Sequence, residues 1–212
     1  YINYIGIFLC WIHLRVVTTL IKYMVYEIKE KLLSIQSINK KYDVPVLRDV
    51  SFDIHNITRP NVAQGQICSL IGKSGSGKST LFRILAGLEK PTSGSVLLHR
   101  DNVWSPIKEG DMGVVFQNSY IYEWRRVDKI IKAAAERGNT ENSIDDLIKS
   151  LDIAKLMTKY SNQISGGQRQ RVALAEQILN GSNNILLDEP FSGLDSLSID
   201  KVTYILAGIA QT

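Results

Sequence analysis

A glycine-rich loop that ends in a lysine and two hydroxyl residues has the residue types best suited to chemistry. The loop consists of Gly72, Lys73, Ser74, Gly75, Ser76, Gly77, Lys78, Ser79 and Thr80. Glycines permit backbone angles that other residues avoid, so successive N–H groups can turn inward around a phosphate chain. In this pattern Lys78 reaches the β- and γ-phosphates, and the hydroxyl of Ser79 binds Mg²⁺. The loop therefore predicts a nucleoside triphosphate site, and a flexible linker rich in glycine and serine is the alternative.

A second anion site is predicted where Ser165, Gly166, Gly167 and Gln168 precede an apolar run at residues 172–180. The run has a helical pattern, so these residues lie at the N-terminus of a helix. The unpaired N–H groups at such an end attract anions. On its own, the Ser-Gly-Gly pattern would indicate only a capped helix start.

Two adjacent carboxylates follow a short apolar run at residues 184–187. The run predicts a buried strand that delivers Asp188 and Glu189 to its carboxyl end. Asp188 is the type of residue that holds Mg²⁺ beside a phosphate loop, and Glu189 can position or deprotonate an attacking water. Alone, the pair would indicate a solvated strand end. Downstream of a phosphate loop and a second anion site, it indicates nucleotide hydrolysis.

The elements that position these residues can be predicted from the apolar pattern. Residues 66–71 before the loop and 81–86 after it predict a strand and a helix. Ahead of them, residues 32–54 read as two antiparallel strands joined through residues 42–45. Tyr42 in that turn can stack on an adenine ring or be an ordinary turn aromatic.

The second half of the chain is expected to be mainly helical. Residues 55–64 are predicted to form a surface loop, and residues 111–116 a short strand that delivers Gln117 to a loop. From residue 121 to residue 160 apolar residues recur at helical spacing. We expect a helical sub-domain at about residues 120–180.

Composition restricts the classes of protein that need consideration. The chain has 212 residues, of which 44% are hydrophobic, enough for one substantial core. The net charge of +4 is too small a bias to indicate nucleic acid as a partner. Cys10 and Cys68 are far apart in sequence and belong to no CxxC pair, which indicates a reducing compartment.

Residues 1–30 form a separate hydrophobic segment, for which we expect a helix. Apolar runs at residues 4–12 and 16–26 are together long enough to span a bilayer. Arg15 would lie near the middle of such a span, where a charge is costly, so an amphipathic helix in the membrane interface is the competing interpretation. A buried segment is the remaining alternative. The nucleotide-binding domain would then cover residues 31–212.

Together, these motifs resemble those of the ATP-binding cassette (ABC) ATPases over about residues 32–212. The glycine-rich loop is similar to the family's Walker A motif, and Gln117 to its Q-loop. The Ser-Gly-Gly-Gln stretch resembles the signature motif, and the Asp-Glu strand resembles Walker B. A Ser-Gly-Leu-Asp stretch ending at Asp195 resembles the D-loop, which implies that Asp195 contacts nucleotide. Tyr42 falls where the family has its adenine-stacking aromatic.

The resemblance implies an α/β fold, in which a P-loop NTPase core carries an antiparallel β sub-domain and a helical signature sub-domain. It implies ATP hydrolysis, with Glu189, Lys78 and Gln117 in catalysis. Ser79, Gln117 and Asp188 would surround Mg²⁺. Each signature helix would cap the ATP held by the other subunit of a dimer.

The partners that the resemblance implies are a second ABC ATPase subunit, identical or not, and transmembrane permease subunits. Such a protein works at the cytoplasmic face of the cell membrane and powers transport. The segment that contains Glu123 and Trp124 resembles importer cassettes of the nitrate, sulfonate and taurine type. The rival classes are a soluble ABC ATPase without a transport role and a regulatory cassette with impaired hydrolysis.

One family element has no counterpart in the sequence. Family members carry a further strand and a histidine after the D-loop helix, whereas the three histidines here are His13, His55 and His99. The sequence is therefore either a fragment or an ATPase with impaired turnover. Without that strand, we expect the strand at residues 185–187 to have an open edge.

Overall fold

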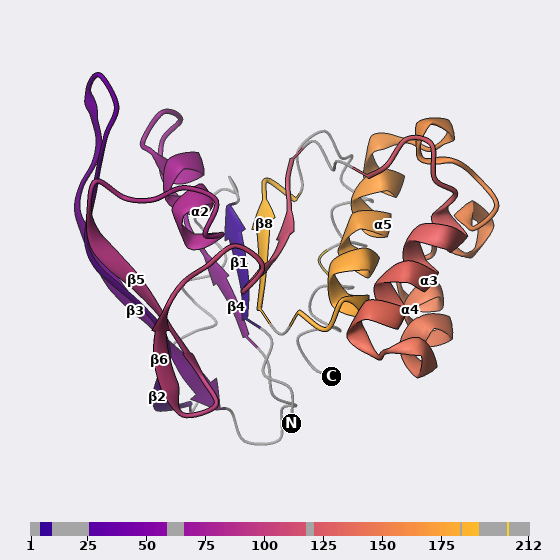
Figure 1. Cartoon of the computed structure of the whole chain (residues 1–212), viewed down its shortest axis with the longest axis horizontal. Coiled ribbons are helices and arrows are strands. Elements are labelled where there is room, and N and C mark those ends of the chain that lie inside the picture. Colours follow the sequence, from indigo (N-terminus) through magenta and orange to yellow (C-terminus); the bar gives the residue numbers. More distant parts are fainter. Residues whose placement is uncertain are drawn as a thin grey trace.

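The computed structural model describes residues 5–9, 26–58, 66–117, 121–182 and 184–190, together with Thr203. In this part of the chain a central sheet lies between two different layers (Figure 1). An antiparallel sheet with helix α2 covers one side, and a group of helices covers the other. The expected α/β architecture, with an antiparallel β part and a helical part, is confirmed.

The central sheet contains four parallel strands in the order β4-β1-β8-β7. They are β4 (Gln66–Ser69), β1 (Ile5–Leu9), β8 (Asn184–Asp188) and β7 (Gly113–Val115). Both faces of β8 are covered, which explains its continuous apolar sequence. The sheet brings the ends of β4 and β8, which precede the glycine loop and Glu189, to one edge.

Strand β1 corrects the expectation of a hydrophobic helix in residues 1–30. Residues 5–9 form a strand that pairs with β4 on one side and β8 on the other, and residues 27–30 already belong to an antiparallel strand. A short apolar run suits a buried parallel strand as well as a helix, so periodicity alone cannot separate them. Residues 1–4 and 10–25, which also belong to the expected helix, lie outside the described residues.

Strand β8 has paired neighbours on both sides. The prediction that it would have an open edge is wrong, because β1 and β7 pair with its two sides.

Within the described ranges, no helix has both the length and the apolar character needed to cross a bilayer.

The antiparallel sheet has the strand order β3-β2-β5-β6. It contains β2 (Glu27–Lys41), β3 (Pro45–Thr58), β5 (Ser93–Arg100) and β6 (Val103–Pro106). The predicted pair of strands joined through residues 42–45 is confirmed.

Strand β3 continues further than the sequence pattern predicted. The surface loop expected at residues 55–64 is wrong for residues 55–58, because β3 stays paired with β2 up to Thr58. Residues 59–64 lie outside the described residues. Side chains support this extension: the Asn56 amide donates to Glu30 at 2.8 Å, and the N–H of Ile57 donates to the Gln66 side chain at 2.9 Å.

Helix α2 (Lys78–Leu85) joins the two sheets through a shared core. Its buried residues Leu81, Phe82, Ile84 and Leu85 pack in one cluster with apolar residues of the antiparallel sheet and with Leu186 of β8. Gly87, with φ 72°, follows the helix. A side chain there would meet the backbone of Lys108 at 2.3 Å, so this end of the helix requires glycine.

The predicted helical region is confirmed. It contains α3 (Val127–Gly138), α4 (Ile144–Ser150) and α5 (Gly166–Leu179). Three short 3₁₀ turns, Glu141–Ser143, Ala154–Leu156 and Ser161–Gln163, join them.

Strand β8 connects this helical core to the rest of the molecule. Successive strand side chains point to opposite faces. Ile185 and Leu187 accordingly belong to the core of the helical region, whereas Leu186 belongs to the core around α2. The strand that ends at the Asp-Glu pair is therefore fixed by both layers.

Candidate functional site

A cavity of about 300 Å³ brings the glycine loop and the Asp-Glu pair together. Its lining residues are Val46, Ser74, Gly75, Gly77, Lys78, Ser79, Thr80, Asp188 and Glu189. The loop comes from the end of β4 and the start of α2, and the two carboxylates come from the end of β8. Sequence reasoning placed these residues in one site, and the structure brings them together.

The conformation of the loop explains its glycines. Gly75 and Gly77 have φ values of 74° and 88°, in the region that side chains disfavour. A Cβ atom on Gly77 would also lie 2.7 Å from a methyl group of Leu47. The N–H of Leu81 donates to the carbonyl of Gly77 at 2.9 Å, which starts α2 directly after the turn. Strand β3 and helix α2 thus hold the loop from two sides.

Lys78 lies over the loop. Its ammonium group donates hydrogen bonds of 2.8 Å to the carbonyl oxygens of Gly72 and Lys73. An ammonium has three donors and no acceptor, and phosphate oxygens can replace these carbonyls at little cost. The lysine is therefore placed at the loop, where a bound phosphate chain would need a cation.

Asp188 lies where a second cation would be favourable. Burial raises the pKa of its carboxyl group above the usual value, and the negative charge of Glu189 raises it further. Arg83 and Lys78 lower that pKa, to a smaller extent. With the Ser79 hydroxyl in the same cavity, the site offers the hard oxygen donors that Mg²⁺ prefers. These residues fit a nucleotide carried with Mg²⁺.

Glu189 has two features that the sequence did not reveal. Its backbone is in the left-handed region, with φ 46°, an uncommon conformation for a glutamate and one that clusters at functional sites. Its carboxylate accepts a hydrogen bond of 2.7 Å from the side-chain amide of Gln117. Gln117, two residues beyond the end of β7, therefore lies beside the Asp-Glu pair, as the family resemblance implied.

Tyr42 lies in the turn between β2 and β3, and the residue is 49% exposed. The cavity lining contains Val46, four residues further along, but not Tyr42 itself. The Tyr42 hydroxyl donates to the carboxylate of Glu89, and the ammonium of Lys40 lies over its ring, 5.0 Å from the ring centroid. Lys40 and Glu89 were missed because no local pattern connects them to Tyr42.

The Ser165 motif forms a site of its own at the start of α5. Ser165 is the N-cap: its hydroxyl accepts from the N–H of Gln168 at 3.3 Å, and the Gln168 side chain accepts from the N–H of Ser165 at 3.0 Å. A Cβ atom on Gly166 would meet no described atom within 4 Å, so this helix end is accessible. The phosphate-loop cavity contains none of these residues in its described lining. Asp195 lies outside the described residues.

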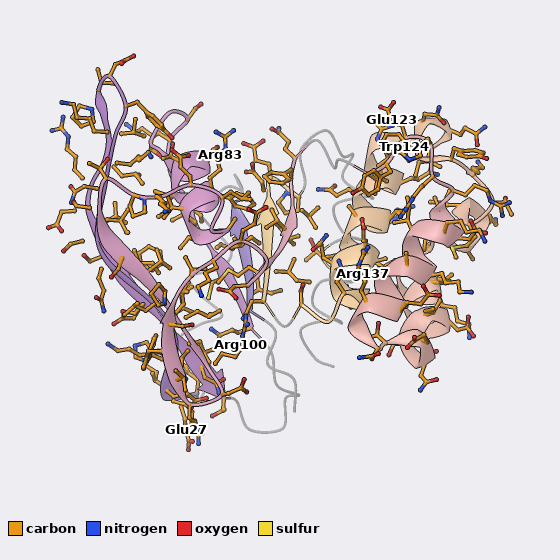
Figure 2. The ribbon with its side chains drawn as sticks, in the orientation of Figure 1. Glu27, Arg83, Arg100, Glu123, Trp124 and Arg137 are labelled. Atoms are coloured by element: carbon orange, nitrogen blue, oxygen red, sulfur yellow. The ribbon has the colours of Figure 1, made fainter. Side chains whose placement is uncertain are left out.

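A second, shallower cleft of about 530 Å³ lies on the helical region. It is lined by Trp124, Arg125, Arg126, Lys129, Lys132, Ala133, Glu136 and Tyr160. Glu123 and Trp124 lie on this side of the molecule, whereas Arg83 of α2 lies on the side of the antiparallel sheet (Figure 2). With Trp124 73% exposed and four cations against one carboxylate, the cleft is an aromatic and basic surface.

Comparison with known proteins gives consistent matches. A family model described as ABC transporter matches residues 55–192. A probable sulfate/thiosulfate import ATP-binding protein of Chlorella vulgaris is 36% identical over 168 residues, which are 76% of this chain and 68% of that protein. The nitrate import ATP-binding protein NrtC of Synechococcus elongatus is 35% identical over 84% of this chain and 28% of its own length. The taurine import ATP-binding protein TauB of Jannaschia sp. is 34% identical, and this chain spans 64% of it.

Solved structures agree with these relatives. The chain is similar to cbiO1 of Clostridium perfringens, part of the ABC transporter complex cbiONQ, with a TM-score of 0.67 and 26% identity over 86% of this chain and 74% of that one. A dimeric ATP-binding cassette in a post-hydrolysis state, bound to ADP and Pi, gives a TM-score of 0.66 and 26% identity over 85% of each chain. From the family match and these relatives, we conclude that this chain belongs to the ABC transporter family.

Proposed function

We propose that this chain is the ATP-binding and ATP-hydrolysing subunit of an ABC importer. The observation that carries the proposal is the cavity in which Lys78, Asp188 and Glu189 meet at the edge of one parallel sheet. The cofactors would be ATP and Mg²⁺. The relatives' names, which describe import ATP-binding proteins, support the direction of transport.

The phosphate chain would bind to the glycine loop. The loop N–H groups and the start of α2 provide a positive concave surface, and Lys78 would exchange its two carbonyl partners for phosphate oxygens. Bound Mg²⁺ supplies charge neutralisation of the phosphates, with Ser79, Asp188 and Gln117 as the residues that would hold it. The loop is preformed, so binding requires little reorganisation.

Glu189 would act as the general base. It lies next to Asp188 in the cavity, and its carboxylate can accept the proton of a water that attacks the γ-phosphate. Gln117 would orient this carboxylate through the 2.7 Å hydrogen bond. The strained backbone of Glu189 supports this role, because the surrounding structure maintains a conformation that costs free energy.

The second anion site supports a dimer. Ser165 caps a helix whose first turn is accessible and lies outside the described lining of the phosphate-loop cavity. In a dimer, Ser165, Gly166, Gly167 and Gln168 would contact the γ-phosphate held by the other subunit, with Asp195 at the same interface. The dimeric cassette among the structural neighbours supports such an arrangement.

The permease subunits would contact the basic and aromatic cleft around Trp124 at the cytoplasmic face of the membrane. This surface begins a few residues after Gln117, so a displacement there can reach the carboxylate of Glu189. Sulfate or thiosulfate, nitrate and taurine, named for the relatives, are all small molecules that carry an oxyanionic group. A small molecule with such a group is therefore the substrate class that we propose.

Binding and turnover by the Lys78→Ala variant test the proposal. Without the ammonium, the phosphate charge lacks its fixed cation, and ATP affinity and turnover are expected to fall by about a hundredfold or more. Lys155→Ala, which removes an exposed lysine of the helical region, is the matched control. Unchanged ATP affinity of Lys78→Ala in calorimetry would contradict the assignment. A wild-type chain that binds ATP without turnover would favour a regulatory cassette.

A further inference from the structure

Tyr42 is held by two charged residues that come from different parts of the fold. Its hydroxyl donates to the carboxylate of Glu89, and Lys40 forms an ion pair of 2.8 Å with the same carboxylate. The ammonium of Lys40 also lies 5.0 Å from the centroid of the Tyr42 ring. One contact at the hydroxyl and one at the ring therefore define the position of the Tyr42 side chain.

The two holding residues are themselves fixed. Lys40 also donates a hydrogen bond of 2.8 Å to the carbonyl of Lys90. One residue further, the N–H of Lys41 donates to Thr92 at 3.0 Å, and the N–H of Thr92 donates to the carbonyl of Asn39 at 2.8 Å. The end of β2 is thereby tied to the connection that follows α2. Since α2 begins in the phosphate loop, Tyr42 is tied to the phosphate site through the same helix.

Lys40 and Glu89 are mostly buried, whereas Tyr42 is accessible, as a residue that contacts a ligand must be. The side chains of Lys40 and Glu89 are only 14% and 19% exposed, whereas Tyr42 is 49% exposed. Hydrogen bonds from Lys40 and then from Tyr42 lower the pKa of Glu89, so the carboxylate stays charged. The charged pair is shielded, and the aromatic side chain that it holds remains accessible.

We propose that Glu89 and Lys40 are positioning residues that hold Tyr42 so that the ring face opposite Lys40 can stack on the adenine of ATP. This inference rests on the proposed function. A ring fixed before binding loses little rotamer freedom when the base arrives, so its stacking contributes more to affinity. The pair would act through Tyr42 and make no contact with the phosphates.

The test compares two ligands that differ in the base. Affinities for MgATP and for Mg²⁺ with inorganic tripolyphosphate are measured by calorimetry on the full chain and its variants. Glu89→Ala is expected to weaken ATP binding by about three- to tenfold, the usual cost of ordering one side chain, and to leave tripolyphosphate binding unchanged. Glu89→Gln retains an acceptor for the Tyr42 hydroxyl but loses the charge that holds Lys40, so it should lie between wild type and Glu89→Ala.

A double-mutant cycle separates a positioning role from a structural one. Tyr42→Ala should weaken ATP binding at least as much as Glu89→Ala, and the combined variant should be no weaker than Tyr42→Ala alone. Three results would each overturn the inference. They are an equal loss of affinity for ATP and for tripolyphosphate in Glu89→Ala, an additive loss of ATP affinity in the double variant, and an unchanged ATP affinity in Glu89→Ala. These results leave the proposed function intact, whereas a wild-type chain that binds neither ligand overturns both.

Discussion

The side-chain amide of Gln117 donates a hydrogen bond of 2.7 Å to a carboxylate oxygen of Glu189. The two residues follow neighbouring parallel strands, β7 and β8, and meet at the edge of the phosphate-loop cavity. A hydrogen bond from an amide to a carboxylate fixes the rotamer of the carboxylate side chain, and with it the direction in which its oxygens can accept a proton. The link therefore connects the loop that would respond to the permease with the residue that would activate water.

The Gln117→Ala variant tests this link. MgATP binding should fall by no more than about tenfold, since only one of the three proposed Mg²⁺ ligands is lost and the glycine loop and Lys78 are untouched, while phosphate release should fall about ten- to a hundredfold further because the carboxylate also loses its orientation. Calorimetry and a phosphate-release assay on the same preparation measure both. Equal turnover of the variant and wild type would show that Gln117 does not position Glu189.

Two glycine variants test the loop geometry as a matched pair. Gly77→Ala places a methyl group against Leu47 at a φ of 88°, so we expect a loss of about 1–3 kcal/mol in stability together with weaker ATP binding. Gly75→Ala has a similar φ of 74°, but its methyl group would meet no described atom within 4 Å, so only about 1 kcal/mol of backbone strain is expected. Thermal melts that rank Gly75→Ala below Gly77→Ala would contradict the packing argument.

A proline substitution tests whether the backbone of β1 is part of the central sheet. Residue 7 pairs with Cys68 of β4 and Leu186 of β8, so Ile7→Pro removes an N–H group between two parallel strands. We expect a loss of about 3 kcal/mol or more in the free energy of unfolding. Ile7→Val, which retains the N–H group, is the control. If both variants melt like the wild type, β1 does not belong to the folded sheet.

Glu176 on α5 gives a pH prediction. Burial raises the pKa of its carboxyl group, and the nearby guanidinium of Arg137 opposes this effect only in part. A carboxyl group with a raised pKa in the folded state contributes stability that is fully present below the pKa of the unfolded chain and is lost as pH rises through the folded pKa. Glu176→Gln should therefore gain stability relative to wild type as the pH rises from about 4.5, the usual pKa of a glutamate, through the raised pKa of the folded state. Urea denaturation across this range that shows a constant difference would contradict the prediction.

The sequence predicted most of the site because its chemistry lies in contiguous stretches. The glycine loop, the Ser165 cap and the Asp-Glu pair each follow or precede an apolar run whose strand or helix character can be recognised locally. Leu81 and Leu186 lie in one core, as expected for a helix packed on a central strand.

What the sequence could not provide depends on contacts between distant residues. The run at residues 5–9 suited a helix, and only its pairing with β4 and β8 makes it a strand. The contacts of Tyr42 with Lys40 and Glu89 join residues from separate elements, and the left-handed backbone of Glu189 has no signature in residue type. The roles predicted for individual site residues stay predictions that the variants above can test.

The central claim is that Glu189 activates the water that hydrolyses ATP bound at the glycine loop. Glu189→Gln retains the volume and hydrogen-bonding capacity of the side chain and spares Asp188, so ATP affinity should stay within about threefold of wild type. Single-turnover phosphate release from the full-length protein should fall by about a hundredfold or more, because the amide cannot accept the proton. A variant that binds ATP and releases phosphate at the wild-type rate would contradict the claim.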